Sequence, residues 1–156
     1  MIRRATSQDV PTILTLIREL AEYEKLAHEV VADEASLHQH LFGAPQRAEV
    51  LIAEHEGSAV GFALFFHNYS TFLSRPGIYL EDLFVRPAHR RKGYGRALLR
   101  ELARLAVERG CGRFEWAVLD WNEPAMKFYR SLGAEQMEAW RIFRITGEAM
   151  ERLSGG

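Results

Sequence analysis

Apolar residues recur with helical spacing in several parts of the chain. Residues 10–21 carry one apolar stripe, which predicts an amphipathic helix that ends near Glu24. A weaker pattern predicts a second helix over residues 33–42. The clearest stripe lies in residues 95–109, where leucines and alanines share one face. A further helix is predicted from residue 124 to about residue 132.

Strand patterns separate these helices. The segment VGFALFF, within residues 59–67, is apolar on both faces and predicts a strand inside a sheet that is covered on both sides. Glu56-Gly57-Ser58 predicts the hairpin turn before it. The expected strands comprise residues 2–4, 48–54, 59–67, 78–85, 114–119 and 140–145. This order of elements predicts an α+β fold with a largely antiparallel sheet in its first half.

Size, charge and cysteine content exclude several classes of protein. With 156 residues the chain has the length of one domain, so we expect a single domain over residues 1–156. It lacks an apolar run of about 18 residues and the apolar core of a signal peptide, so neither a membrane span nor secretion is expected. The net charge of -1 gives no reason to expect nucleic acid as a partner. The single cysteine, Cys111, excludes internal disulfides and is typical of the cytoplasm.

The segment RRKGYG, residues 90–95, lies between a predicted strand and the long helix. A helix N-terminus presents unpaired N–H groups and a positive dipole end, and glycines let an anion approach the backbone. Neighbouring Arg and Lys side chains add charge-assisted hydrogen bonds to phosphate. We therefore predict a pyrophosphate site, with a solvated basic turn as the alternative. The residues assigned to it are Arg90, Arg91, Lys92, Gly93, Tyr94, Gly95 and Arg96.

This loop lacks the third glycine of a dinucleotide fingerprint and the GK[ST] of a Walker loop, and it resembles the acetyl-coenzyme A loop of the GNAT superfamily of N-acetyltransferases. Matching segments in the same order are IRRAT, LIRELAEYE, VGFALFF, YLEDLFVRP, VLDWNEPAMKFYRSLGA and GEAMERL. Over about residues 3–153 the chain is similar to the spermidine/spermine (diamine) branch. VLDWN and GEAMERL are most similar to its thialysine N-acetyltransferase subgroup.

The resemblance implies the GNAT fold, a mixed and mostly antiparallel sheet of about six or seven strands flanked by about four helices. It also implies acetyl-CoA as cosubstrate, a homodimer, and acetyl transfer to the primary amine of a small molecule in a ternary complex. Ser70 and Thr71 stand where polyamine enzymes carry an acid. Because a second ammonium would lack its partner there, an amino-acid amine such as thialysine is favoured over spermidine.

Such a reaction needs a proton acceptor and a proton donor. A lysine-like ammonium has a pKa of about 10.4, so removing its proton near pH 7.4 costs about 4 kcal/mol, and only the neutral amine attacks. The resemblance gives the role of base, or of water-organising carboxylate, to Glu81; an ordinary acid pair is the alternative. Its neighbour Asp82 faces the other way in a regular strand, and only a β-bulge would bring both carboxylates to one site. Tyr129 matches the tyrosine that the superfamily places near the departing sulfur, so the resemblance gives it the role of proton donor. The alternative is a half-buried core tyrosine whose hydroxyl contacts water.

The remaining candidates hold the two ligands. Backbone groups of Leu83, Phe84 and Val85 are expected to pair with the amides of the pantetheine arm, which requires an open strand edge. Asn122 is assigned to the same cosubstrate, or else caps the following helix. The resemblance also gives a set of residues that face the amine; a solvated helix end or a packed aromatic residue is the alternative for all of them except Asp82. That set is Tyr23, Glu24, Asp82, Glu138 and Trp140.

The sequence bears on three other possible functions. His38 and His40 are two residues apart on a predicted helix and face different ways, so no metal site is expected. A non-catalytic coenzyme A-binding module would keep the loop without turnover. An acetyltransferase that modifies a lysine or the N-terminus of a protein would also suit acidic residues on the substrate side.

Overall fold

The computed structural model describes residues 1–155, and the chain divides into two compact units. The first unit spans Met1–Leu119 and the second spans Asp120–Gly156. Within residues 1–155 the first unit contains five strands and three α-helices, and the second contains two α-helices.

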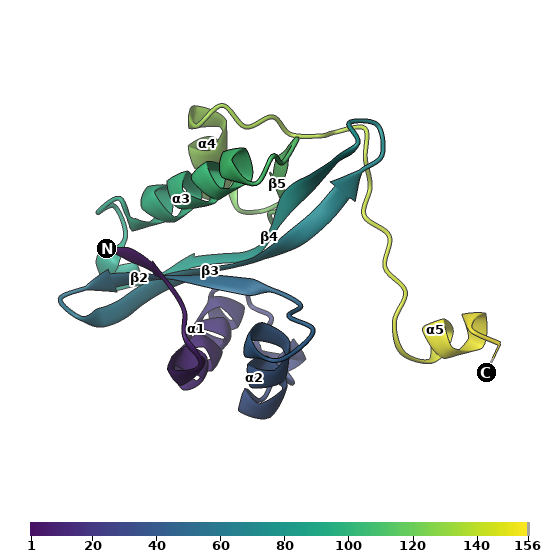
Figure 1. Ribbon diagram of the computed structural model, residues 1–156, viewed down its shortest axis with the longest axis horizontal. Helices are drawn as coiled ribbons and strands as arrows, with labels where there is room; N and C mark the ends of the chain where they lie inside the picture. The colour runs from purple at the N-terminus through teal and green to yellow at the C-terminus, as the bar shows by residue number, and fades with distance from the viewer. Residues whose placement is uncertain (156) are drawn as a thin grey trace. The chain divides into compact units, whose positions relative to one another are not determined.

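A five-stranded sheet forms the centre of the first unit (Figure 1). Its strands lie side by side in chain order as β1 (Ile2–Arg4), β2 (Glu49–His55), β3 (Ser58–Ser70), β4 (Arg75–Val85) and β5 (Phe114–Trp116). Neighbours from β1 to β4 pair antiparallel, whereas β5 runs parallel to β4. Because a parallel pair needs a crossover connection, the helix α3 (Tyr94–Glu108) joins β4 to β5.

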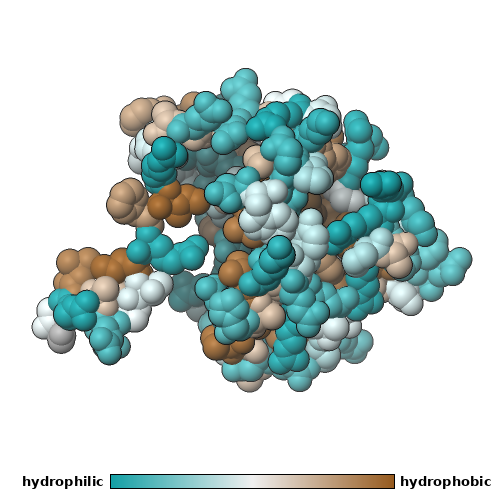
Figure 2. All heavy atoms as spheres, turned by 180° about the vertical axis from the view of Figure 1, so that it is seen from behind, coloured by the Kyte–Doolittle hydropathy of each residue, from teal (hydrophilic) through white to brown (hydrophobic). Residues whose placement is uncertain are grey.

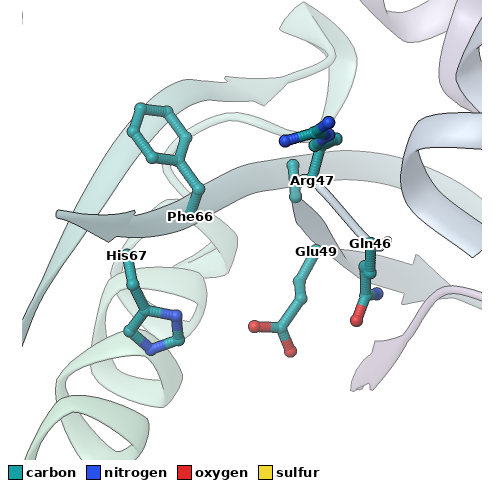
Figure 3. A pocket seen from close by; sticks show the side chains of 6 residues that line it. Gln46, Arg47, Glu49, Phe66 and His67 are labelled. Carbon is teal, nitrogen blue, oxygen red and sulfur yellow. The ribbon is translucent and has the colours of Figure 1, made fainter. Parts of the chain in front are cut away.

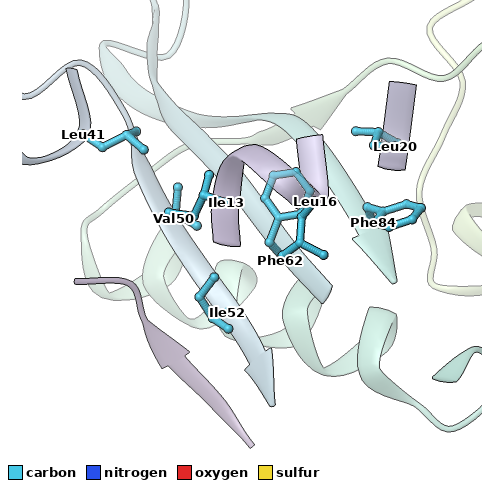
Figure 4. Close-up of a cluster of buried hydrophobic side chains, with 8 residues drawn as sticks. All are labelled: Ile13, Leu16, Leu20, Leu41, Val50, Ile52, Phe62 and Phe84. Carbon is cyan, nitrogen blue, oxygen red and sulfur yellow. The ribbon is translucent and has the colours of Figure 1, made fainter. Parts of the chain in front are cut away.

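Helices cover both faces of this sheet (Figure 1). The helices α1 (Val10–Tyr23) and α2 (Glu34–Phe42) lie on one face, and α3 lies on the other. The buried cluster beneath α1 and α2 consists of Ile13, Leu16, Leu20, Leu41, Val50, Ile52, Phe62 and Phe84 (Figure 4). Each fully buried apolar side chain contributes roughly 1.5–3 kcal/mol, so this cluster holds α1, and the residues at its end, firmly against β3 and β4.

The chain enters α1 through a short 3-10 turn (Ser7–Asp9) with the capping box that the spacing of Thr6 and Asp9 indicates. The Arg3 guanidinium donates two hydrogen bonds to the Asp9 carboxylate, at 2.8 and 2.9 Å, and one to Glu54 at 2.8 Å. These bonds from Arg3 lower the pKa of Asp9 to about 2. They tie the edge strand β1 to the start of α1.

The second unit contains α4 (Glu123–Ser131) and α5 (Gly147–Leu153). The strand predicted at residues 140–145 is wrong: the described chain between these helices forms neither helix nor strand. Its apolar residues favour a strand, but no neighbouring strand pairs with its backbone in the described structure. Trp140 is 76% and Phe143 is 95% exposed. Figure 2 shows hydrophobic side chains gathered along this end of the chain.

The predicted α+β class and the mixed, mostly antiparallel sheet are confirmed. Over residues 1–155 the sheet has five strands rather than six or seven, because residues 140–145 add none. The last strand, β5, ends at Trp116 instead of reaching residue 119. The helix α5 was not expected from periodicity and makes five helices in the described chain instead of four. Among the described helices none is long and apolar enough to cross a membrane.

Candidate active site

The strand β4 contains a β-bulge at Glu81. Leu64 of β3 pairs with Asp82, while the next residue, Phe65, pairs with Leu80. Consecutive residues of β3 therefore pair with residues of β4 that are two positions apart, and Glu81 is the extra residue between them. From the sequence we expect adjacent carboxylates at residues 81 and 82 to reach one site only if the strand contains a β-bulge, and the structure contains this bulge.

The bulge decides which face of the sheet carries these side chains. Leu64 and Phe66 are two residues apart on β3, so their side chains share a face. Their partners Asp82 and Tyr79 share it as well, although they are three residues apart on β4. Leu64 packs against the cluster beneath α1. The insertion of Glu81 therefore leaves Asp82 on the face that α1 covers.

Two neighbouring carboxylates act on Asp82 at this point. Burial, followed by the negative charges of Glu81 and Glu24, raises the pKa of Asp82 to about 7. Glu24 directly follows α1, and burial raises its pKa too. Asp82 and Glu24 are half-buried, whereas Glu81 is exposed. The bulge and the end of α1 thus form an acidic cluster suited to a cation, the property expected of an amine site.

One edge of β4 is open beside this cluster. The strand β5 pairs with β4 only over Ile78–Leu80, so among the described residues the edge from Glu81 to Val85 has no strand neighbour on that side. The open edge that was predicted beside Leu83 and Val85 is therefore present. Phe84 buries its side chain in the core beneath α1, so only its backbone is available to a ligand.

The predicted anion loop follows directly. After a 3-10 turn (Pro87–His89), the chain passes Arg91 at φ 63° and Gly93 at φ 88°, and α3 begins at Tyr94. A Cβ at Gly93 would meet no atom within 4 Å, and one at Gly95 would meet only Val85 Cγ2 at 3.9 Å. The left-handed backbone favours glycine at position 93. The first N–H groups of α3 therefore lie beside open space, which an anion can approach.

The basic residues of this loop divide into two groups. Arg91, Lys92 and Arg96 are exposed and take part in none of the ion pairs formed by the described residues. Arg90 instead turns inward: its Nε donates to the Val85 carbonyl oxygen at 2.9 Å, and its guanidinium lies 4.5 Å from the centre of the Tyr23 ring. The first group is available to phosphate oxygens, while Arg90 links the loop to β4 and to α1.

His55 is a contributor to this region that sequence reasoning missed. Its Nδ1 lies 2.6 Å from the Tyr94 hydroxyl, which attaches the first turn of α3 to the end of β2. The His89 ring packs 5.5 Å from the His55 ring, and burial lowers the pKa of His89. No sequence motif marks His55, because its partner is 39 positions away. The hydrogen bond keeps the start of α3 in place beside the loop.

These features fit acetyl-coenzyme A, whose pantetheine arm contains amides and whose diphosphate is an anion. The open edge of β4 presents backbone groups to an amide-containing arm. The start of α3, with Arg91, Lys92 and Arg96 around it, suits a diphosphate. All the residues assigned to the cosubstrate except Asn122 lie in this part of the first unit.

The second unit holds the other four candidates. Asn122 is buried and caps α4, its Oδ1 accepting a hydrogen bond from the Ala125 amide at 3.4 Å, so the capping alternative is present in the structure. Tyr129 is half-buried on α4, and its ring lies 5.8 Å from that of Phe128. Glu138 and Trp140 are exposed on the irregular segment.

Ser70 lies at the far end of the hairpin formed by β3 and β4. It pairs with Arg75, five residues along β4 from Leu80, which at about 3.3 Å per residue is about 17 Å from the bulge. Its side chain is buried, and its hydroxyl accepts a hydrogen bond from the Leu73 amide at 3.2 Å. Within one chain Ser70 is therefore a turn residue that does not reach the carboxylate cluster.

A polar pocket of about 290 Å³ lies elsewhere on the first unit and includes Glu49 and His67 in its lining (Figure 3). Arg109 donates to both carboxylate oxygens of Glu49, at 2.7 and 2.9 Å. Since the acid in this pocket is already paired and none of the predicted site residues lines it, the pocket is not the candidate site.

Comparisons with known proteins agree with this picture. Residues 13–134 match the Acetyltransferase (GNAT) family. The chain is 42% identical to the thialysine N-epsilon-acetyltransferase of Bos taurus over 166 residues, which cover 99% of this chain and 97% of that protein. It is 36% identical to the L-ornithine N5-acetyltransferase NATA1 of Arabidopsis thaliana, with 97% and 86% covered.

Solved structures show the same fold. An integron cassette protein from the mobile metagenome of V. cholerae superposes with a TM-score of 0.84 at 26% identity, covering 100% of this chain and 98% of that chain. An aminoglycoside acetyltransferase from an uncultured soil metagenomic sample superposes with a TM-score of 0.80 at 23% identity, covering 95% and 96%. The fold implied by the sequence resemblance is confirmed.

Proposed function

Because the chain belongs to the acetyltransferase (GNAT) family, we propose that it moves an acetyl group from acetyl-CoA to the side-chain amine of a small amino acid such as thialysine or ornithine. That the chain is an N-acetyltransferase acting on the amine of a small molecule follows from its full-length relatives. The amino-acid acceptor is the finer step. It is supported by the names of those relatives and by the chemistry of the site.

The observation that carries the proposal is the position of the acidic cluster. The negative charges of Glu24 and Glu81 act on Asp82 beside the unpaired edge of β4, and the glycine-containing loop follows that strand. A cationic amine and an acyl thioester would therefore be held by adjacent parts of one unit.

The proton acceptor that the reaction requires lies in the bulge pair Glu81 and Asp82. Acetyl-CoA supplies the activated acetyl group and a thiol leaving group. The carboxylates first attract the ammonium by charge and then take up its proton, because only the neutral amine is a nucleophile. Tyr129 is proposed to donate a proton to the departing sulfur. Asn122, whose Oδ1 caps α4, keeps its amide NH2 for the cosubstrate.

The proposed acceptor carries one reacting amine and an α-carboxylate. A site with an additional acid would repel that carboxylate, whereas the hydroxyls of Ser70 and Thr71 would not. Ser70 lies about 17 Å from the bulge within one chain. It can therefore influence which amine binds only if a second copy of the chain brings its own hairpin to the site. The substrate proposal is therefore tied to a homodimer.

A homodimer is also supported by exposed apolar side chains. Trp140, Ile142 and Phe143 in the second unit, and Phe72 at the tip of the hairpin, are all more than three quarters exposed. Contiguous exposed apolar patches mark interaction surfaces, and three of these residues lie within four positions of the chain. We propose that a second copy covers them, and that Glu138 and Trp140 take part in amine binding within that assembly.

The cytoplasm is the proposed compartment. Cys111 is free, and disulfides are rare in the reducing cytoplasm. The small net charge of -1 supports neither nucleic acid nor an anionic membrane surface as a partner.

A ranked panel of acceptors tests the proposed function. We would measure coenzyme A release with thialysine, ornithine, lysine, putrescine, spermidine and a lysine-containing peptide, and compare kcat/KM. Thialysine or ornithine should rank first, by roughly 5–150-fold over spermidine if one unpaired ammonium separates them. Equal activity on spermidine would return the chain to diamine acceptors, a preference for the peptide would indicate a protein acetyltransferase, and no release with any amine would indicate a non-catalytic module.

A further inference from the structure

The two neighbouring carboxylates of the bulge occupy different environments. Glu81 is the inserted residue and is exposed to solvent. Asp82 is half-buried on the face beneath α1, and among the described residues no hydrogen bond or ion pair involves its carboxylate. The charges that act on it come from Glu81 on its own strand and from Glu24 at the end of α1, and both are negative.

We infer that Asp82, and not Glu81, receives the proton of the substrate ammonium, while Glu81 and Glu24 supply the negative charge that draws the ammonium in. This inference rests on the proposed function and assigns the proton acceptor within it. It departs from the sequence resemblance, which gives the role of base to Glu81. The half-buried position without a hydrogen-bond donor carries the assignment, because such a carboxylate gains most from a proton or a cation.

The ammonium nitrogen gives one proton to an Asp82 carboxylate oxygen, directly or through one water, and becomes a neutral amine with its lone pair free. The C–N bond forms as the C–S bond breaks, and the second proton lost from nitrogen balances the one that the sulfur gains. Asp82 then returns its proton to solvent, so one proton is released in each turnover.

The electrostatics support the same residue. With a pKa of about 7, Asp82 is partly ionised at neutral pH and is a stronger base than an ordinary carboxylate. Relative to an acceptor of pKa ~3.9, transfer from the ammonium becomes roughly 1000-fold less unfavourable. Because Glu81 and Glu24 both contribute to this rise, removing either charge should lower the pKa of Asp82.

Three variants distinguish the two carboxylates. Asp82→Asn should lower kcat by about 100-fold or more and remove the acid limb of the pH profile near pH 7. Glu81→Gln and Glu24→Gln should keep that limb but move it to lower pH, with a higher KM for the amine. Glu22→Gln, which removes an exposed carboxylate of α1 two residues from Glu24, is the matched control and should leave the profile unchanged.

A readout without turnover completes the test. The chain has four aspartates, so carboxyl-13C labelling of aspartate should show one carboxyl that titrates near pH 7, and Asp82→Asn should remove that signal. The inference is overturned if the acid limb persists in Asp82→Asn and vanishes in Glu81→Gln, or if no aspartate titrates near pH 7. If the wild-type protein acetylates none of the amines, the proposed function fails, whatever the titration shows.

Discussion

The half-buried carboxylate of Asp82 makes the stability of the folded protein depend on pH. An unfolded aspartate has a pKa of about 3.9, whereas burial and the charges of Glu81 and Glu24 raise the folded pKa of Asp82 to about 7. Between these values the folded state binds more protons than the unfolded state. Stability therefore falls as pH rises, and the loss is complete above the folded pKa.

Asp82→Asn should remove this loss. We expect the free energy of unfolding to rise by about 2 kcal/mol at pH 8 and to change little near pH 4. The value of about 2 kcal/mol is half of the free energy that corresponds to the pKa difference, because solvent screens a carboxylate that is only half-buried. Urea denaturation at the two pH values measures the difference. A variant that is destabilised equally at both would show that the carboxylate is not held in an unfavourable environment.

Tyr129 is the second residue whose role can be separated from packing. Phenylalanine keeps the ring and its contact with Phe128, 5.8 Å between centroids, and removes only the hydroxyl. If the hydroxyl protonates the departing thiolate, Tyr129→Phe should lower kcat by about 100-fold and leave acetyl-CoA affinity close to wild type. Single-turnover rates and calorimetry measure the two quantities. Full kcat with chemistry rate-limiting would refute the role as acid.

At the scale of elements, the start of α3 is the part most open to a direct test. A side chain at Gly95 would meet only Val85 Cγ2, at 3.9 Å, so Gly95→Val should leave the fold intact. It would fill the space beside the helix N-terminus, and acetyl-CoA affinity should fall at least 10-fold. Ala103→Val, an exposed position of the same helix, controls for the lower helix propensity of valine. Unchanged affinity in folded Gly95→Val would exclude this loop as the diphosphate site.

Elements defined by local sequence were predictable, whereas those that depend on distant partners were not. The stripes of α1 and α3 lie on single helices, and periodicity alone located them. The bulge at Glu81 appears only in the register between β3 and β4, so the sequence could state it only as a condition. His55 acquires its role from Tyr94, 39 positions away. Residues 140–145 have strand composition but, in the described structure, no strand to pair with.

At the scale of the whole molecule, the exposed apolar residues point to a second copy of the chain. Phe72 at the hairpin tip is 102% exposed and Phe143 in the second unit is 95% exposed, a costly arrangement for an isolated chain in water. The same hairpin carries Ser70, whose proposed part in choosing the amine also requires a partner.

Light scattering at micromolar concentration should therefore give about twice the 17.9 kDa of one chain. Phe143→Asp places a charge where apolar contact is proposed, and it should shift the mass toward that of a single chain while circular dichroism stays unchanged. Val107→Asp, an equally drastic change at an exposed position of α3, is the control and should leave the mass at two chains. If amine choice depends on the hairpin of a partner, Phe143→Asp should also reduce the preference for thialysine over spermidine. A wild-type mass of one chain would remove the dimer and, with it, the role given to Ser70.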